Sequence, residues 1–282
     1  MKDAFRDRLS GLGWPADGER GPRARRASSS PSPRSLDELP GATRTDGLLV
    51  IERSAAELSP DALDTLLDGF RQASGAAAPA DADGEVRALI ERPERALFID
   101  TETTGLAGNM VFLLGTMRFT KGDIVLTQAL ARDYREERAL LEVWLDMARG
   151  AGMLVSFNGK AFDAPVLRDR VGLHRLEAAP EPLHVDLLHH ARRRWKSVLP
   201  DCRLQTIEWQ LCRRRRAGDI PGEEIPAAYH HFVRTGDARE MLAVLHHNAL
   251  DLLTLADIAV ALGRGDGGDG ARSGARFRRE VG

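Results

Sequence analysis

A short apolar run that ends in two acidic residues constrains this chain more than any other stretch. Residues 96–99 read Ala-Leu-Phe-Ile between Pro93 and Gly105, a length and setting typical of a buried strand. Asp100 and Glu102 follow two positions apart, so on a strand their side chains share one face. Adjacent carboxylates repel each other unless a cation lies between them, and oxygen ligands favour Mg²⁺ or Mn²⁺. The pair therefore indicates a divalent metal site, although a polar strand end running into a turn produces the same pattern.

The composition is that of an ordinary globular protein. The 282 residues, 43% hydrophobic and 29% charged, suffice for one large domain or two small ones. The formal net charge of -2 argues neither for nor against binding of nucleic acid. Cys202 and Cys212 have no metal-ligand spacing around them and indicate reduced thiols in a cytoplasmic protein. No apolar run approaches the roughly 18 residues of a membrane span, and no secretory signal opens the chain, so we expect no membrane contact.

The two ends of the chain differ in composition from its middle. Residues 1–46 contain a stretch rich in Pro, Ser and Arg and are predicted to form a disordered basic tail, and the Gly- and Arg-rich residues 263–282 a second one. Such tails are most often solvated extensions, although a basic tail also suits non-specific contact with nucleic acid. Residues 47–85 are predicted to contain a short strand, a helix capped by Ser59 and a linker. Whether this segment packs on the main domain or recruits a partner is left open by its sequence.

The chain after the acidic pair alternates between strand and helix patterns. Apolar runs at 111–119 and 124–131, joined by Lys121-Gly122-Asp123, are typical of a hairpin. Further elements are expected in the following order: an amphipathic helix over 136–149, a strand over 153–157, a helix over 164–171, a strand over 183–186 and mostly helix from 204 to 262. This order predicts a mixed α/β sheet covered by helices.

Three later acidic residues fall at informative positions. Asp163 opens a helix soon after Asn158, and Asp186 ends a strand, so each is placed to cap backbone amides without any further role. Asp251 instead lies inside a strongly helical pattern, where a carboxylate caps nothing and, if buried, requires a partner. His247 precedes Asp251 by four residues and therefore shares its face of the helix.

Together these motifs resemble those of the DEDD exonucleases of the ribonuclease H-like superfamily. The similarity runs from about residue 94 to 262 and is greatest to the bacterial YprB-type ribonuclease H-like proteins. The shared motifs are D-x-E-T-T-G-L from Asp100, N-G-x-x-F-D from Asn158, H-x-D-L-L-H from His184 and H-N-x-x-D ending at Asp251. The resemblance implies a ribonuclease H-like mixed sheet flanked by helices over residues 94–262.

The resemblance also implies the chemistry of the site. It implies two divalent cations, Mg²⁺ or Mn²⁺, held by four carboxylates: Asp100, Glu102, Asp163 and Asp251. Two such ions suit in-line hydrolysis of a phosphodiester, because they activate a water and stabilise the charge on phosphate and leaving oxygen. A basic residue four or five positions before the last Asp assists that water in the superfamily. This chain has His247 and His246 at those positions, and helical geometry favours His247.

Substrate contacts are expected from basic and polar residues near the same end of the sheet. Residues 192–196 and 213–216 are basic clusters, and basic residues beside an aromatic suit a groove for a single strand, although a charge run is equally typical of a solvated face. The candidate substrate-binding residues are Thr103, Asn158, Asp186, Arg192 and Arg193. Residues 106–111 depart from the Gly/Thr-rich turn of such proteins, which leaves recognition of the terminal nucleotide open.

We therefore expect a cytoplasmic, metal-dependent nuclease acting on a single-stranded DNA or RNA end, most simply a 3′-5′ exonuclease. A structure-selective endonuclease on the same fold is one alternative, because carboxylates alone do not dictate end preference. A catalytically weak nucleic-acid-binding protein is another. The intact carboxylates argue against it, because an unneutralised acidic cluster repels phosphate. The sequence does not distinguish DNA from RNA and indicates no protein partner.

Overall fold

The computed structural model describes residues 35–58, 60–75, 84–105, 110–212, 216 and 219–264. Most of the two expected tails, the turn at 106–109 and most of the second basic cluster (213–215) lie outside these residues. No helix among the described residues is long and apolar enough to cross a membrane.

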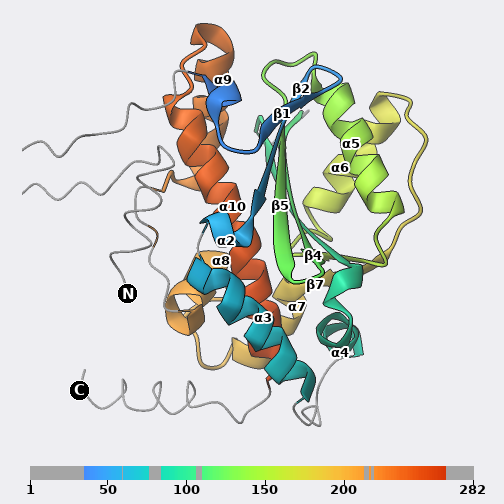
Figure 1. The fold of residues 1–282 in the computed structure, drawn as a ribbon, viewed down its shortest axis with the longest axis vertical. Helices are drawn as coiled ribbons and strands as arrows, with labels where there is room; N and C mark the ends of the chain where they lie inside the picture. Colours follow the sequence, from blue (N-terminus) through green and yellow to red (C-terminus); the bar gives the residue numbers. More distant parts are fainter. Residues whose placement is uncertain are drawn as a thin grey trace, which may run out of the picture.

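A seven-stranded mixed sheet forms the centre of the fold, in the order β1-β2-β5-β4-β3-β6-β7 (Figure 1). Its strands are β1 (Ala42–Thr45), β2 (Leu48–Ser54), β3 (Ala96–Thr103), β4 (Val111–Thr120), β5 (Asp123–Leu130), β6 (Met153–Ser156) and β7 (Leu183–Asp186). β3, β6 and β7 run parallel to one another. The other neighbouring pairs, β1–β2, β2–β5, β5–β4 and β4–β3, are antiparallel. The predicted β4–β5 hairpin and the mixed α/β class are confirmed.

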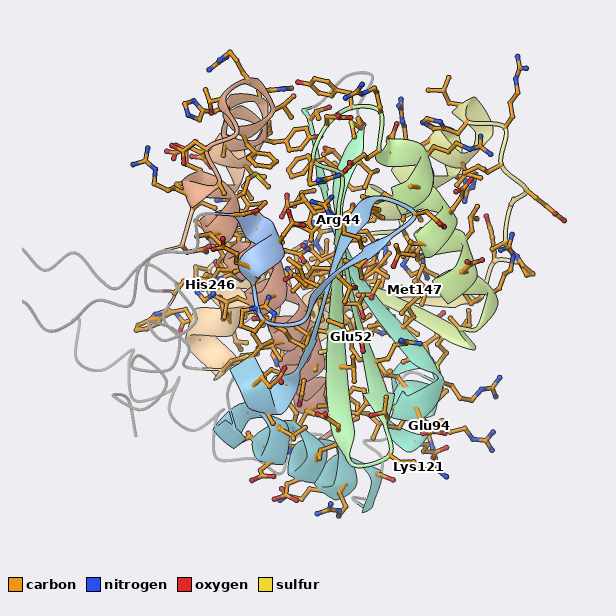
Figure 2. All side chains as sticks on the ribbon, turned by 45° about the horizontal axis from the view of Figure 1, so that its top comes forward. Arg44, Glu52, Glu94, Lys121, Met147 and His246 are labelled. Carbon is orange, nitrogen blue, oxygen red and sulfur yellow. The ribbon has the colours of Figure 1, made fainter. Side chains whose placement is uncertain are left out.

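Helices cover both faces of this sheet (Figure 1). They are α2 (Ala55–Leu58), α3 (Pro60–Gly75), α4 (Gly84–Glu91), α5 (Glu137–Arg149), α6 (Asp163–Leu173), α7 (Leu187–Trp195), α8 (Leu204–Ile207), α9 (Ile225–Thr235) and α10 (Arg239–Gly263), with a π-helical turn over Glu208–Cys212 and 3-10 turns over Leu36–Glu38, Pro93–Arg95 and Gly222–Glu224. α5 and α6 lie on one side, and the long α10 lies on the other. Figure 2 labels Met147 of α5 and His246 of α10 on these opposite sides.

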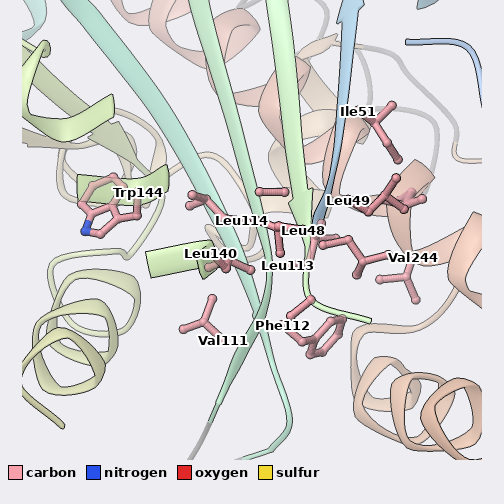
Figure 3. Close-up of a cluster of buried hydrophobic side chains, with 14 of the residues drawn as sticks. Leu48, Leu49, Ile51, Val111, Phe112, Leu113, Leu114, Leu140, Trp144 and Val244 are labelled. Carbon is pink, nitrogen blue, oxygen red and sulfur yellow. The ribbon is translucent and has the colours of Figure 1, made fainter. Parts of the chain in front are cut away.

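Apolar side chains from both faces of the sheet fill the space under the helices. Along β4, Val111 points toward Leu140 of α5, whereas the next residue, Phe112, points toward Val244 of α10 (Figure 3). This alternation follows from the two-residue period of a strand. Because both faces are covered, the central strands read as continuous apolar runs rather than as alternating ones.

The segment before β3 belongs to the same sheet. β2 pairs with β5 and β1 pairs with β2, and Leu36 and Leu39 are buried beside them. The expectation that disorder extends to residue 46 is therefore wrong for residues 36–45. Three of the four β1 residues are exposed, so this edge strand carries no apolar pattern by which it is recognised. α3 packs against α10, so the 47–85 segment is packed on the main sheet in its described part.

Candidate active site

Strand β3 carries the first two carboxylates. Its residues 96–99 are fully buried, and Asp100 and Glu102 follow on the half-buried end of the strand. Burial raises the pKa of Asp100 well above its usual range, and the negative charges of Asp251, Glu102 and Asp163 raise it further. Burial likewise raises the pKa of Glu102 to about 8. The four carboxylates that the sequence singled out therefore lie close enough to affect one another's ionisation.

Asp163 is held by the strand that carries the first pair. Its Oδ1 atom accepts hydrogen bonds from the backbone N–H (3.1 Å) and the hydroxyl (2.6 Å) of Thr101. The preceding turn requires a glycine at 159, because a Cβ there would lie 2.3 Å from Ser156 Oγ and 3.0 Å from Asp163 Oδ2. The start of α6 is thereby fixed against the end of β3.

Asp186 holds this turn in place. Its carboxylate is buried and accepts hydrogen bonds from the backbone N–H groups of Asn158 (2.8 Å), Lys160 (3.1 Å) and Leu188 (3.1 Å). Asn158 adopts a φ of 66°, in the left-handed region that asparagine tolerates. These contacts correct the substrate contact that we expected for Asp186: its oxygens are committed to backbone amides, and it acts on the site by shaping the turn before Asp163.

Helix α10 brings Asp251 and His247 to the end of β3. The two side chains lie one helical turn apart, with His247 Nε2 3.4 Å from Asp251 Oδ2. The other oxygen of Asp251 forms an ion pair with Arg216. Only 11% of the Asp251 side chain is exposed, so these two cations supply the partners that a buried mid-helix carboxylate requires.

An ionic network lies behind Asp251. It contains Arg216 together with Glu208 and Asp219, two residues that the sequence did not single out. Arg216 Nε lies 2.5 Å from Glu208, and Arg216 Nη1 lies 3.1 Å from Asp219. Asp219 Oδ1 lies 2.9 Å from Nδ1 of His247. Although burial opposes protonation of His247, the hydrogen bonds to Asp219 and Asp251 raise its pKa to about 11. The guanidinium of Arg216 is thus buried in the site and does not lie on a solvent-exposed face.

The two candidate histidines have different surroundings. His246 is 4% exposed, and burial lowers its pKa to about 4. His246 lies near enough to Arg53 of β2 for the charge of that residue to lower the pKa further. His247, by contrast, contacts Asp251 directly. The arrangement thus places the imidazole of His247 against a member of the carboxylate cluster.

The remaining substrate candidates lie on β3, just after β6 and on α7. Thr103 and Asn158 are half-buried at the ends of β3 and β6, and the Thr103 hydroxyl lies 3.4 Å from the carbonyl oxygen of Gly105. Arg192 and Arg193 are exposed on α7, the helix that Asp186 caps. Their contact with substrate stays a prediction.

The donor chemistry suits a hard divalent cation. In the described part of the chain, no three or more His, Cys, Asp or Glu side chains are arranged to hold a metal ion as they stand. Burial, however, raises the pKa values of Asp100 and Glu102, and the neighbouring negative charges raise them further. A cation between such oxygens removes that repulsion. Asp251 already contacts Arg216 and His247, so an ion would use its remaining lone pairs.

Comparison with known proteins gives a consistent family match. Residues 97–263 match the family model described as RNase_H superfamily. A stretch of 172 residues is 39% identical to the uncharacterized protein YprB of Bacillus subtilis (strain 168), which covers 59% of this chain and 41% of that protein. The matched stretch therefore spans less than half of the relative. The fold is also similar to part of the family B DNA polymerase of the hyperthermophilic archaeon Pyrobaculum calidifontis, with a TM-score of 0.49 and 16% identity over 60% of this chain and 24% of the polymerase; so weak a likeness carries no functional argument.

Proposed function

Because the chain belongs to the RNase_H superfamily, we propose that it is a nuclease that hydrolyses phosphodiester bonds with divalent metal ions, as a 3′-5′ exonuclease on single strands. One arrangement carries the proposal. Asp163 is hydrogen-bonded to Thr101, which lies between Asp100 and Glu102 on β3, and Asp100 is hydrogen-bonded to Asn248 on the helix that carries Asp251. Side chains from β3, α6 and α10 thus converge on one negative cluster, which is unfavourable for a protein that only binds phosphate.

Each residue of the cluster has a distinct role in this proposal. The residues that would hold the ions are Asp100, Glu102, Asp163 and Asp251. Bound ions supply an activated water and stabilise the charge that grows on the phosphate and the leaving oxygen. Thr101 fixes one oxygen of Asp163 through two hydrogen bonds, and Arg216 fixes one oxygen of Asp251.

His247 is the group that we propose accepts a proton from the attacking water. Its Nε2 atom faces Asp251, and Asp219 holds the opposite ring nitrogen. A general base must be neutral, and in the arrangement described here the two carboxylates hold the imidazole in its charged form, with a pKa of about 11. A cation held by Asp251 would offset one of the two charges that hold that proton and would thereby favour the neutral imidazole of His247.

The experiment that tests this function follows the products on end-labelled substrate. Single strands of DNA and of RNA, each labelled at the 5′ end, are incubated with the protein and Mn²⁺. A ladder of progressively shortened labelled strands is expected. Internal fragments without a ladder would show an endonuclease instead, and retarded but intact strands would show binding without cleavage.

A matched pair of variants accompanies this assay. Asp163→Asn keeps the shape of the side chain but removes the charge and should abolish the ladder. Asp146→Asn makes the same change on the exposed face of α5, where Asp146 contacts Arg149 in a surface ion pair, and should leave the ladder intact.

A further inference from the structure

A chain of buried polar side chains crosses the sheet and ends on Asp100. Arg53 Nη2 of β2 donates to Gln128 Oε1 of β5 at 2.6 Å. Gln128 Nε2 donates to Asn248 Oδ1 of α10 at 2.9 Å, and also to the carbonyl oxygen of Leu245 at 2.7 Å. Asn248 Nδ2 donates to Asp100 Oδ2 at 2.8 Å and to the Asp100 carbonyl oxygen at 3.1 Å. These hydrogen bonds therefore join β2, β5, α10 and β3.

The chemistry of these side chains fixes which group donates and which accepts in each hydrogen bond. A guanidinium only donates hydrogen bonds, so the amide of Gln128 must present its oxygen to Arg53. The Gln128 nitrogen is then left to donate, and the carbonyl of Leu245, which only accepts, holds it in that orientation. Asn248 must in turn present its oxygen to Gln128 and its NH₂ group to Asp100. The charge of Arg53 on β2 thus determines that the carboxylate of Asp100 faces a hydrogen-bond donor, the NH₂ group of Asn248.

Burial prevents the two side-chain amides from turning over. Gln128 is 1% exposed and Asn248 is 0% exposed, so turning either amide would leave buried polar atoms without partners in a place that water does not reach. The fold also reserves space for the Asn248 amide. Gly115 of β4 lies opposite Asp100 in the strand register, and a Cβ at that glycine would lie 2.1 Å from Asn248 Oδ1.

We propose that Arg53, Gln128 and Asn248 are positioning residues that hold one carboxylate oxygen of Asp100, so that its other oxygen is aimed at the metal ions. This inference rests on the proposed function. A carboxylate among like charges tends to turn away from its neighbours, and a hydrogen bond donated to one oxygen opposes that rotation. Partners behind a metal ligand orient it in this way.

The proposal gives the N-terminal segment a part in the active site. Arg53 lies outside residues 97–263, the region that matches the superfamily, whereas Gln128 and Asn248 lie within it. β2 is paired with β5 along its length, which places Arg53 against the strand that carries Gln128. A purely structural role would be to hold β2 against α10, and the test therefore separates metal affinity from stability.

The decisive variant is Gln128→Glu. The new side chain has the same shape and pairs with Arg53, but it cannot donate to Asn248. Asn248 must then turn its NH₂ group toward residue 128 and its oxygen toward Asp100, where the two oxygens repel each other. Mn²⁺ binding to the folded protein is measured by titration calorimetry without any nucleic acid. We expect the affinity to fall by about 10- to 100-fold.

Two further variants complete the test. Gly115→Ala pushes on the Asn248 amide without changing any polar group and should weaken Mn²⁺ binding in the same direction. Thr116→Val changes the neighbouring buried residue, whose hydroxyl faces Met147 and the carbonyl oxygen of Thr127, and should leave Mn²⁺ affinity unchanged even if it lowers the melting temperature.

The outcomes separate the two proposals. Parental Mn²⁺ affinity in folded Gln128→Glu or folded Gly115→Ala would overturn the positioning role of Arg53, Gln128 and Asn248 but not the proposed function. Failure of both variants to fold would also overturn the positioning role, in favour of a network that serves packing. If the parent protein binds no Mn²⁺, both the metal-dependent function and the positioning role are overturned.

Discussion

The Nδ1 atom of His247 lies 2.9 Å from Oδ1 of Asp219. This contact fixes the imidazole so that its other nitrogen faces Asp251, and Arg216 in turn pairs with both carboxylates. The histidine is thus oriented by a residue 28 positions away in the sequence. Its alignment at the carboxylate cluster depends on that second residue as much as on the helix that carries it.

Loss of Asp219 should therefore impair turnover without preventing substrate from binding. Asp219→Asn keeps the size of the side chain but weakens its hold on His247 and Arg216. We expect kcat to fall about 10-fold or more, as for other partners behind reactive groups, with KM little changed. Asp237→Asn, at a half-buried position just before α10, is the matched control and should keep the parental kcat. An unchanged kcat in Asp219→Asn would show that the ring needs no such support.

The two histidines should differ sharply in mutational effect. His247→Ala removes the imidazole beside Asp251, and removal of a general base lowers turnover by roughly 10²- to 10⁴-fold. His246→Ala removes a buried side chain beside β2, so it should lower the melting temperature but change kcat little. Single-turnover rates, measured well below each variant's melting temperature, distinguish the two. A larger loss in His246→Ala would mean that the chain uses the five-residue spacing.

The glycine before α6 should be required for the position of Asp163. Gly159→Ala places a Cβ 2.3 Å from Ser156 Oγ and 3.0 Å from Asp163 Oδ2, so the turn has to shift. We expect weaker Mn²⁺ binding and slower cleavage. Gly150→Ala at the end of α5 is the control, because its Cβ meets nothing nearer than the Met147 carbonyl oxygen at 3.6 Å. Equal Mn²⁺ affinities for the two variants would contradict this reading of the turn.

Sequence patterns located the strand and helix that carry the acidic residues, but not what lies behind those residues. Asp100 and Asp251 stand out because an apolar strand and an apolar helix surround them. Asp219 lies outside any regular element, and Gln128 occupies one polar position in a strand, so neither interrupts a recognisable period. Their importance comes from contacts across 28 and 120 residues of sequence, which local patterns do not encode.

The fold should also weaken in acid through a buried carboxylate away from the cluster. Although burial opposes ionisation of Glu137, the hydrogen bonds from Arg170, His174 and the Val111 N–H hold its pKa below the usual value of 4.5. A carboxyl group with a lowered folded pKa contributes stability above its unfolded pKa, and that contribution is lost as the pH falls through the folded pKa. The free energy of unfolding should therefore decline below about pH 4.5.

The variant Glu137→Gln isolates this contribution. It should be less stable at pH 7 and should show a flatter decline on acidification, as measured by denaturant unfolding at a series of pH values. Glu142→Gln, on the exposed face of the same helix, is the control and should follow the parent. A Glu137→Gln protein with the parental pH dependence would place the acid sensitivity elsewhere.

The measurement that bears most directly on the account is Mn²⁺-dependent cleavage of a labelled single strand by Asp100→Asn. The substitution removes one charge from the centre of the cluster, and removing that repulsion should raise the melting temperature of the metal-free protein. We predict that cleavage by this folded variant is abolished. Cleavage by Asp100→Asn at the parental rate would contradict the assignment of the carboxylate cluster as the catalytic site.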